Sequence, residues 1–62
     1  MNEISIGNKY LGKMNDILFE VVNIEVKNDY RYVDVKCLNK KGDKKFLQIE
    51  YETFKKLNLK EI

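Results

Sequence analysis

Glu25, Tyr32 and Glu50 are the residues of this 62-residue chain whose types could carry out acid–base chemistry. The strand pairings derived below place the two carboxylates on either side of Tyr32 on one face of a sheet. General acid–base catalysis needs a pocket that makes one carboxyl group much more acidic than the other. The convex face of a very small sheet seldom forms such a pocket. We therefore expect solvated charges around Tyr32 and no enzymatic activity.

The residue types that bind metals and cofactors are scarce in this chain. It has no His and a single Cys37, which cannot form an intramolecular disulfide or complete a structural zinc site. Cys37 is expected to be a small buried hydrophobic residue. Gly7, Gly12 and Gly42 are isolated and do not form a phosphate-binding loop. We expect no cofactor or metal, and a reducing, cytoplasmic location.

A cluster of lysines could bind nucleic acid, because lysines neutralise phosphates and nearby aromatic rings can stack on bases. The formal net charge of only +2 speaks against this function, as does the presence of carboxylates between the aromatic residues. A solvated turn that lysines protect from edge-to-edge aggregation is the alternative interpretation. The lysines in question are Lys36, Lys40, Lys41, Lys44 and Lys45.

The overall composition indicates one small globular domain, residues 1–62. A chain of this length buries about 60% of the surface that its unfolded form exposes, so its core is small. No apolar run approaches the ~20 residues that span a bilayer, so we expect no membrane association. Eleven of the twelve basic residues are Lys, and Ala, Pro and Trp are absent. This bias is typical of AT-rich genomes, and we expect a low-GC bacterium, its phages or mobile elements as the source.

The chain is predicted to be all-β, with one helical turn before its last strand. β-Branched residues are frequent in the longest predicted strand, and the Asn28-Asp29 turn suits a two-residue hairpin loop. The first five residues are expected to be loosely ordered. The predicted strands are 8–11, 17–27, 30–38, 44–51 and 59–62, with a turn at 39–43 and the helical turn at 53–57.

Two turn assignments, made separately, predict the same inward face. Pairing Lys27 with Tyr30, and Leu38 with Lys44, gives two apolar rows that cross three strands. These rows are Val22–Val35–Leu47 and Ile24–Val33–Ile49. The core is expected to include in addition Tyr10, Phe19 or Leu18, Phe54, Leu57, Leu59 and Ile62.

This order of elements resembles small SH3-like barrel proteins of bacteria and phages. The resemblance rests on three segments: Gly7–Tyr10, Phe19–Ile24 and Thr53–Leu59. It implies a five-stranded SH3-like barrel with a single helical turn before the last strand. Eukaryotic SH3 domains use clustered Tyr residues, a Trp and an acidic loop to bind proline-rich peptides. This chain has no Trp, and its first loop is too short to match. Peptide binding of that kind is therefore not expected.

The outward face of the predicted sheet carries an apolar patch, which is expected to be either an interface or a surface partly covered by the N-terminal arm. We expect a non-enzymatic binding module that attaches to a host protein and modulates it, with a homo-oligomer as a further expectation for its edge strands. Nucleic-acid binding is the first alternative, and sequestration of a nucleotide ligand by an oligomer is the second. The patch consists of Val21, Tyr30, Tyr32 and Phe46.

Overall fold

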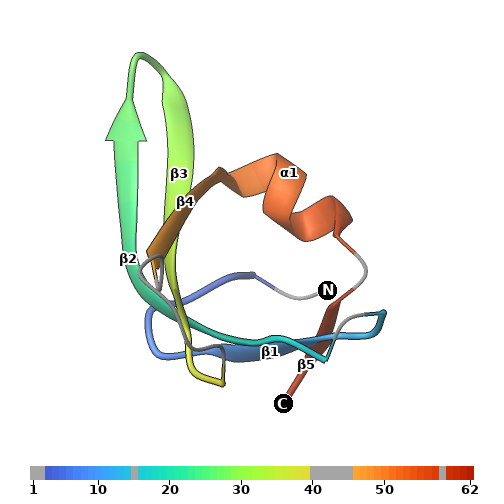
Figure 1. The fold of residues 1–62 in the computed structure, drawn as a ribbon. Helices are drawn as coiled ribbons and strands as arrows, with labels where there is room; N and C mark the ends of the chain where they lie inside the picture. Colours follow the sequence, from blue (N-terminus) through green and yellow to red (C-terminus); the bar gives the residue numbers. More distant parts are fainter. Residues whose placement is uncertain (1–2, 15, 40–45, 58) are drawn as a thin grey trace.

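The computed structural model describes residues 3–14, 16–39, 46–57 and 59–62. Its elements follow the predicted order, with five strands and one short helix before the last strand (Figure 1). They are β1 (Lys9–Gly12), β2 (Leu18–Lys27), β3 (Tyr30–Cys37), β4 (Phe46–Glu50), α1 (Tyr51–Lys56) and β5 (Leu59–Glu61).

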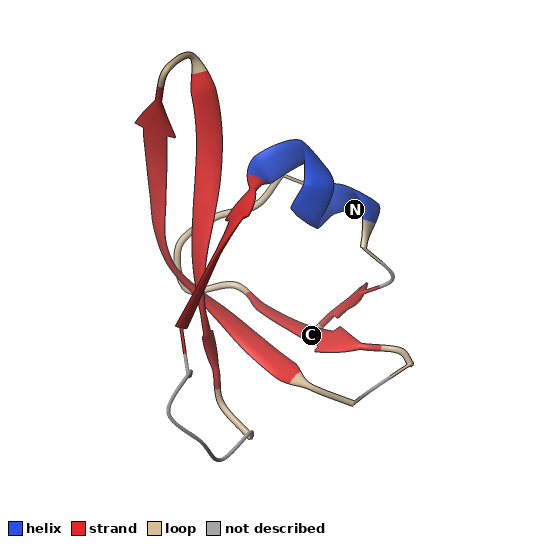
Figure 2. Cartoon of the chain, turned by 45° about the horizontal axis from the view of Figure 1, so that its top comes forward, coloured by secondary structure: helices blue, strands red, loops and turns tan. Residues whose placement is uncertain are grey.

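All five strands form one antiparallel sheet in the order β4-β3-β2-β1-β5. β2 is the longest strand, and it pairs with β1 near its start and with β3 along most of its length. The sheet is strongly bent, so that β1 and β5 lie across from α1, while the β2–β3 hairpin projects to one side (Figures 1 and 2). The all-β prediction is confirmed. The barrel is not closed, because no described residue of β4 pairs with β5.

The Asn28-Asp29 turn sets the register of the central hairpin as predicted. Both residues have positive φ angles, of 49° and 67°, as a type I′ turn requires. Lys27 pairs with Tyr30, and Ile24 pairs with Val33. The pairing of β3 with β4 is also the predicted one.

The register of β2 shifts at Val22, and this contradicts part of the prediction. Asn23 pairs with Asp34, but the next residue of β3, Val35, pairs with Val21 and not with Val22. Val22 is therefore the extra residue of a β-bulge. Val21 is 1% exposed and belongs to the core, whereas Val22 is 38% exposed. The predicted inward position of Val22 and outward position of Val21 are both wrong.

The core lies between the bent sheet and α1. Tyr10 and Phe54, both fully buried, make an edge-to-face contact with ring centroids 5.4 Å apart. The predicted core positions of Tyr10, Phe19 and Phe54 are confirmed, while Leu57 and Ile62 are exposed. The buried residues are Ile4, Tyr10, Phe19, Val21, Val33, Val35, Cys37, Tyr51 and Phe54.

Ile4 and Tyr51 are core residues that the sequence analysis did not predict. The buried backbone N–H of Ile4 donates a hydrogen bond to the Tyr51 hydroxyl, at 3.1 Å. Tyr51 was expected to end a strand, but it begins α1 and points inward. Ile4 thus places the N-terminal segment against the helix, although the first five residues were expected to be loosely ordered.

Candidate functional site

The outer face of β2, β3 and β4 is the surface on which the sequence analysis placed its candidate residues. Successive side chains of a strand alternate between the two faces, so every second residue of β3 lies on this side. From the hairpin end inward, the rows are Lys27–Tyr30, Glu25–Tyr32–Glu50, Asn23–Asp34–Gln48 and Glu20–Lys36–Phe46.

Val21 does not belong to this face, so the predicted four-residue patch is incomplete. Tyr30 and Phe46 are 61% and 63% exposed, and Tyr32 is half-buried. Tyr32 pairs with Glu50, whereas Phe46 pairs with Lys36, four residues along β4. A strand rises about 3.3 Å per residue, so roughly 13 Å separates these two rows. The aromatic residues therefore form two separate sites.

A polar network occupies the surface between the two aromatic sites. The Gln48 amide donates to Asp34 at 2.9 Å and to Glu25 at 3.3 Å, and its oxygen accepts a hydrogen bond from the Lys27 ammonium at 3.4 Å. Asn23 donates to the second oxygen of Asp34, at 3.3 Å. The amides of Asn23 and Gln48 thus donate to the carboxylates of this face, and these hydrogen bonds order the polar side chains in the middle of the sheet.

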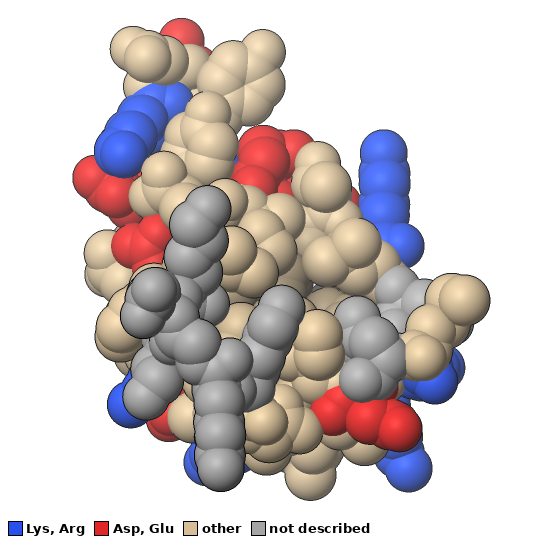
Figure 3. All heavy atoms as spheres, viewed as in Figure 1, with Lys and Arg blue, Asp and Glu red and all other residues tan. Residues whose placement is uncertain are grey.

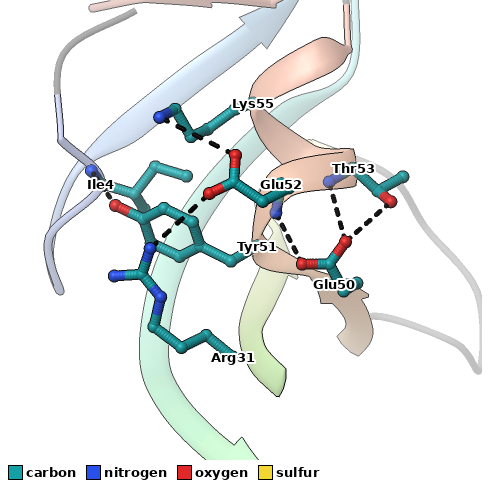
Figure 4. A network of polar contacts seen from close by, with 7 residues as sticks. All are labelled: Ile4, Arg31, Glu50, Tyr51, Glu52, Thr53 and Lys55. Atoms are coloured by element: carbon teal, nitrogen blue, oxygen red, sulfur yellow. Dashed lines mark hydrogen bonds and ion pairs between the residues drawn. The ribbon is translucent and has the colours of Figure 1, made fainter. Parts of the chain in front are cut away.

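Glu50 is a helix cap, a role that the sequence analysis missed. Its carboxylate accepts hydrogen bonds from the backbone N–H of Glu52 at 2.8 Å and of Thr53 at 3.3 Å (Figure 4). The N–H of Glu52, followed by the N–H and hydroxyl of Thr53 and the charge of Lys56, holds the pKa of Glu50 below its usual value of 4.5, against a smaller effect of desolvation. Glu is an uncommon capping residue, so the sequence gives little sign of this role.

The predicted acid–base arrangement around Tyr32 is present as a row of pairings. Both carboxylates are already engaged, however. Glu50 caps α1, and Glu25 accepts from Gln48 and lies 3.7 Å from the Lys27 ammonium. The two carboxylates therefore have structural partners, in the helix cap and in the polar network.

Arg31 connects the hairpin to α1. Its guanidinium carbon lies 3.8 Å from the centroid of the Tyr51 ring, and Nη2 lies 3.7 Å from a Glu52 oxygen (Figure 4). Lys55 approaches the same Glu52 at 4.0 Å. A cation–π contact of this kind contributes about 0.5–1 kcal/mol at an exposed site. It links the inner side of the hairpin to α1.

The hairpin end carries apolar side chains that are largely exposed to solvent. Val26 is 67% exposed on the inner side and Tyr30 is 61% exposed on the outer side. The hairpin extends beyond the rest of the sheet in Figures 1 and 2. Its end shows uncharged atoms beside both acidic and basic side chains in Figure 3. The hairpin end thus exposes apolar and charged side chains together.

Most of the predicted lysine cluster lies outside the described residues: Lys40, Lys41, Lys44 and Lys45. Lys36 is exposed on the outer face, in one row with Glu20 and Phe46. Its charge therefore has a carboxylate neighbour of opposite sign.

The described residues contain no group of three or more His, Cys, Asp or Glu that could hold a metal ion. Cys37 is buried and unpaired, as expected. None of the described helical residues forms a segment long and apolar enough to cross a membrane. Comparison with family models, curated proteins and solved structures finds no significant match.

Proposed function

We propose that this protein is a non-enzymatic binding module that attaches to another protein through the end of its β2–β3 hairpin. The observation that supports this function most directly is the exposure of Val26 and Tyr30 on a projecting, well-defined hairpin. A small domain has few apolar residues with which to build a core. Two that remain in solvent at one end contribute little to folding, and their burial by a partner would favour binding.

The geometry of the hairpin suits a binding role. The type I′ turn and the Arg31 contact with Tyr51 hold it in one orientation before any partner arrives. A preorganised surface loses less conformational entropy on binding. Tyr is also among the residues that most often dominate the binding energy of interfaces. Tyr30 is therefore the central contact of the proposed surface, with Tyr32 next to it on the outer face and Val26 on the opposite face of the same hairpin end.

The amino-acid composition, with many Lys and no Ala, Pro or Trp, supports a phage or mobile element with an AT-rich genome as the source. The partner would then be a host protein in the cytoplasm. Modulation of that protein requires only binding. The carboxylates of the outer face are used for capping and side-chain hydrogen bonds, which agrees with a role without catalysis.

Affinity capture from an extract of the source cells tests the proposal. The protein and a Val26→Ser/Tyr30→Ser variant are immobilised at equal density, and the captured proteins are quantified. Met14→Ser is the matched control, because Met14 is 89% exposed in the β1–β2 connection, away from the hairpin. Wild type and Met14→Ser should enrich the same protein, and the double variant should lose it at least tenfold. Equal enrichment by all three proteins would show that the hairpin is not the binding surface.

A further inference from the structure

The two ends of the sheet differ in how they are protected from other strands. β5 is three residues long, and two of them, Lys60 and Glu61, are charged. β4 is five residues long, without Lys or Pro, and its Phe46 and Leu47 are 63% and 42% exposed. Natural sheets usually protect an edge by shortness, charge or proline. Over its described length, β4 has a single charged residue, Glu50 at its last position, and no lysine or proline.

The backbone of β4 is hydrogen-bonded along one edge. Its ladder is formed with β3, and α1 is the one other element that it contacts among the described residues. No described residue makes a further backbone hydrogen bond to β4. The N–H and C=O groups on its free edge can therefore accept another strand.

Leu47 lies on the inner face of the sheet, yet it is exposed. It shares a row with Val35, which is fully buried. The exposure of Leu47 thus reflects the missing neighbour at this edge. A further strand beside β4 would place a side chain against Leu47 on the same face.

We propose that two copies of this chain pair through the free edges of β4, antiparallel, about a twofold axis at Gln48. In this register Leu47 lies opposite Ile49 of the second copy, and Phe46 lies opposite Glu50 of the second copy. The same contacts recur on both sides of the axis, as an isologous interface requires. Each copy of β4 thereby covers Leu47 on the inner face of the other copy, at the free edge of the sheet.

The residues of β4 favour this register over its neighbours. Directly opposed residues of an antiparallel pair must lie on the same face of the sheet. For two copies of β4, the twofold axis can therefore pass through Leu47, Gln48 or Ile49, and these are the neighbouring registers to compare. A shift in one direction brings α1 into the pairing region, and a shift in the other shortens the paired part of β4. The register centred on Gln48 uses all five residues.

The charges agree with the same register. Glu50 is the one charged residue of β4, and it faces Phe46 of the second copy, so no like charges oppose each other. Lys36 lies on the other side of that Phe46 in its own sheet. Opposite charges therefore flank each Phe46. The interface is short compared with stable ones, which bury about 1,200–2,000 Å², so the dimer should be reversible and depend on concentration.

Cross-linking tests both the interface and its register. Gln48→Cys and Phe46→Cys are each made in a Cys37→Ala background and treated with a short bismaleimide at rising protein concentration. Gln48→Cys should cross-link to a dimer, because position 48 faces itself. Phe46→Cys, which faces position 50, should cross-link at least fivefold less. Circular dichroism confirms that each variant is folded, and both positions are exposed.

Light scattering provides a test that needs no cysteine. The mean mass of the wild type should rise from monomer toward dimer between micromolar and millimolar concentration. Phe46→Glu places a carboxylate opposite Glu50 of the second copy and should remain monomeric. Phe46→Lys places an ammonium group opposite the same carboxylate and should still dimerise. A wild type that stays monomeric, or equal cross-linking at positions 46 and 48, would overturn the inference. Neither result depends on whether the hairpin binds a partner.

Discussion

Phe54 and Phe46 show how differently the same residue type can act in this protein. Phe54 is fully buried in α1 against Tyr10, whereas Phe46 is 63% exposed at the start of β4. Truncating a buried Phe removes its transfer free energy and leaves a cavity. We expect Phe54→Ala to lower the free energy of unfolding by about 3–5 kcal/mol, which is most of the stability of so small a domain.

Urea unfolding followed by circular dichroism measures this loss, with Phe46→Ala as the matched control. An exposed side chain contributes little to stability, so the control should change by about 0.5 kcal/mol or less. Similar losses for the two variants would mean that the helix does not pack as described.

Glu50 makes the stability of the fold depend on pH. The backbone N–H of Glu52 is the largest of the effects that keep the pKa of Glu50 below 4.5 in the folded protein. Because the folded pKa lies below the unfolded one, the cap stabilises the fold above pH 4.5. This contribution is lost as the pH falls through the folded pKa. We expect Glu50→Gln to lower the melting temperature at pH 7 and to have a much smaller effect at pH 3.

Thermal melts from pH 7 to pH 3 measure this difference for wild type and Glu50→Gln. Glu61→Gln serves as the control, because it removes the same charge from β5 without affecting a helix cap. A constant gap between wild type and Glu50→Gln across this range would exclude the cap as a source of pH dependence.

At the scale of elements, the sequence allowed the central hairpin to be predicted because its turn is locally determined. Asn28 and Asp29 tolerate positive φ, and a two-residue loop leaves one register for the strands that follow it. The helix before β5 was predicted from its own segment, at 53–57, and it lies at Tyr51–Lys56. The bulge at Val22 could not be predicted, since Val21 and Val22 are identical in type and an apolar pattern cannot tell them apart.

The bulge predicts that one substitution has a large effect at Val21 and a small effect at the adjacent Val22. Val21→Thr keeps the shape of the side chain but buries a hydroxyl group without a designed partner, which should cost about 1–3 kcal/mol. Val22→Thr, at a 38% exposed position, should change stability by about 0.5 kcal/mol or less. Chemical denaturation of the two variants measures the difference. If Val22→Thr were the more destabilising of the two, the strands would have to pair regularly, without a bulge.

The candidate site was predicted in part, for reasons that also concern register. Tyr30, Tyr32 and Phe46 lie on the outer face as expected, because they lie on the hairpin strands whose register was correct. Val21 was placed there wrongly, because it lies beyond the bulge. The polar network around Gln48 was not predicted, since its hydrogen bonds depend on rotamers of amides and carboxylates that strand patterns do not encode.

At the scale of the whole molecule, the open side of the sheet is filled by other parts of the chain. β4 and β5 are not paired, and α1 with the N-terminal segment covers the core between them. Ile4 is 3% exposed, and its N–H bonds to the Tyr51 hydroxyl across 47 residues of sequence. The N-terminal segment and α1 are thus packed together, although they lie far apart in the sequence, and local sequence patterns could not show this contact.

Tyr51→Phe tests this closure, because it removes one oxygen and keeps the ring on which Arg31 lies. The buried N–H of Ile4 then loses its acceptor, and an unsatisfied buried donor costs about 1–3 kcal/mol. Hydrogen exchange measured by NMR should show the Ile4 amide protected in the wild type and exchanging much faster in Tyr51→Phe. Tyr30→Phe removes the same atom from an exposed ring and should alter neither stability nor exchange at Ile4. Unchanged protection of the Ile4 amide in Tyr51→Phe would mean that the N-terminal segment is held by its side chain alone.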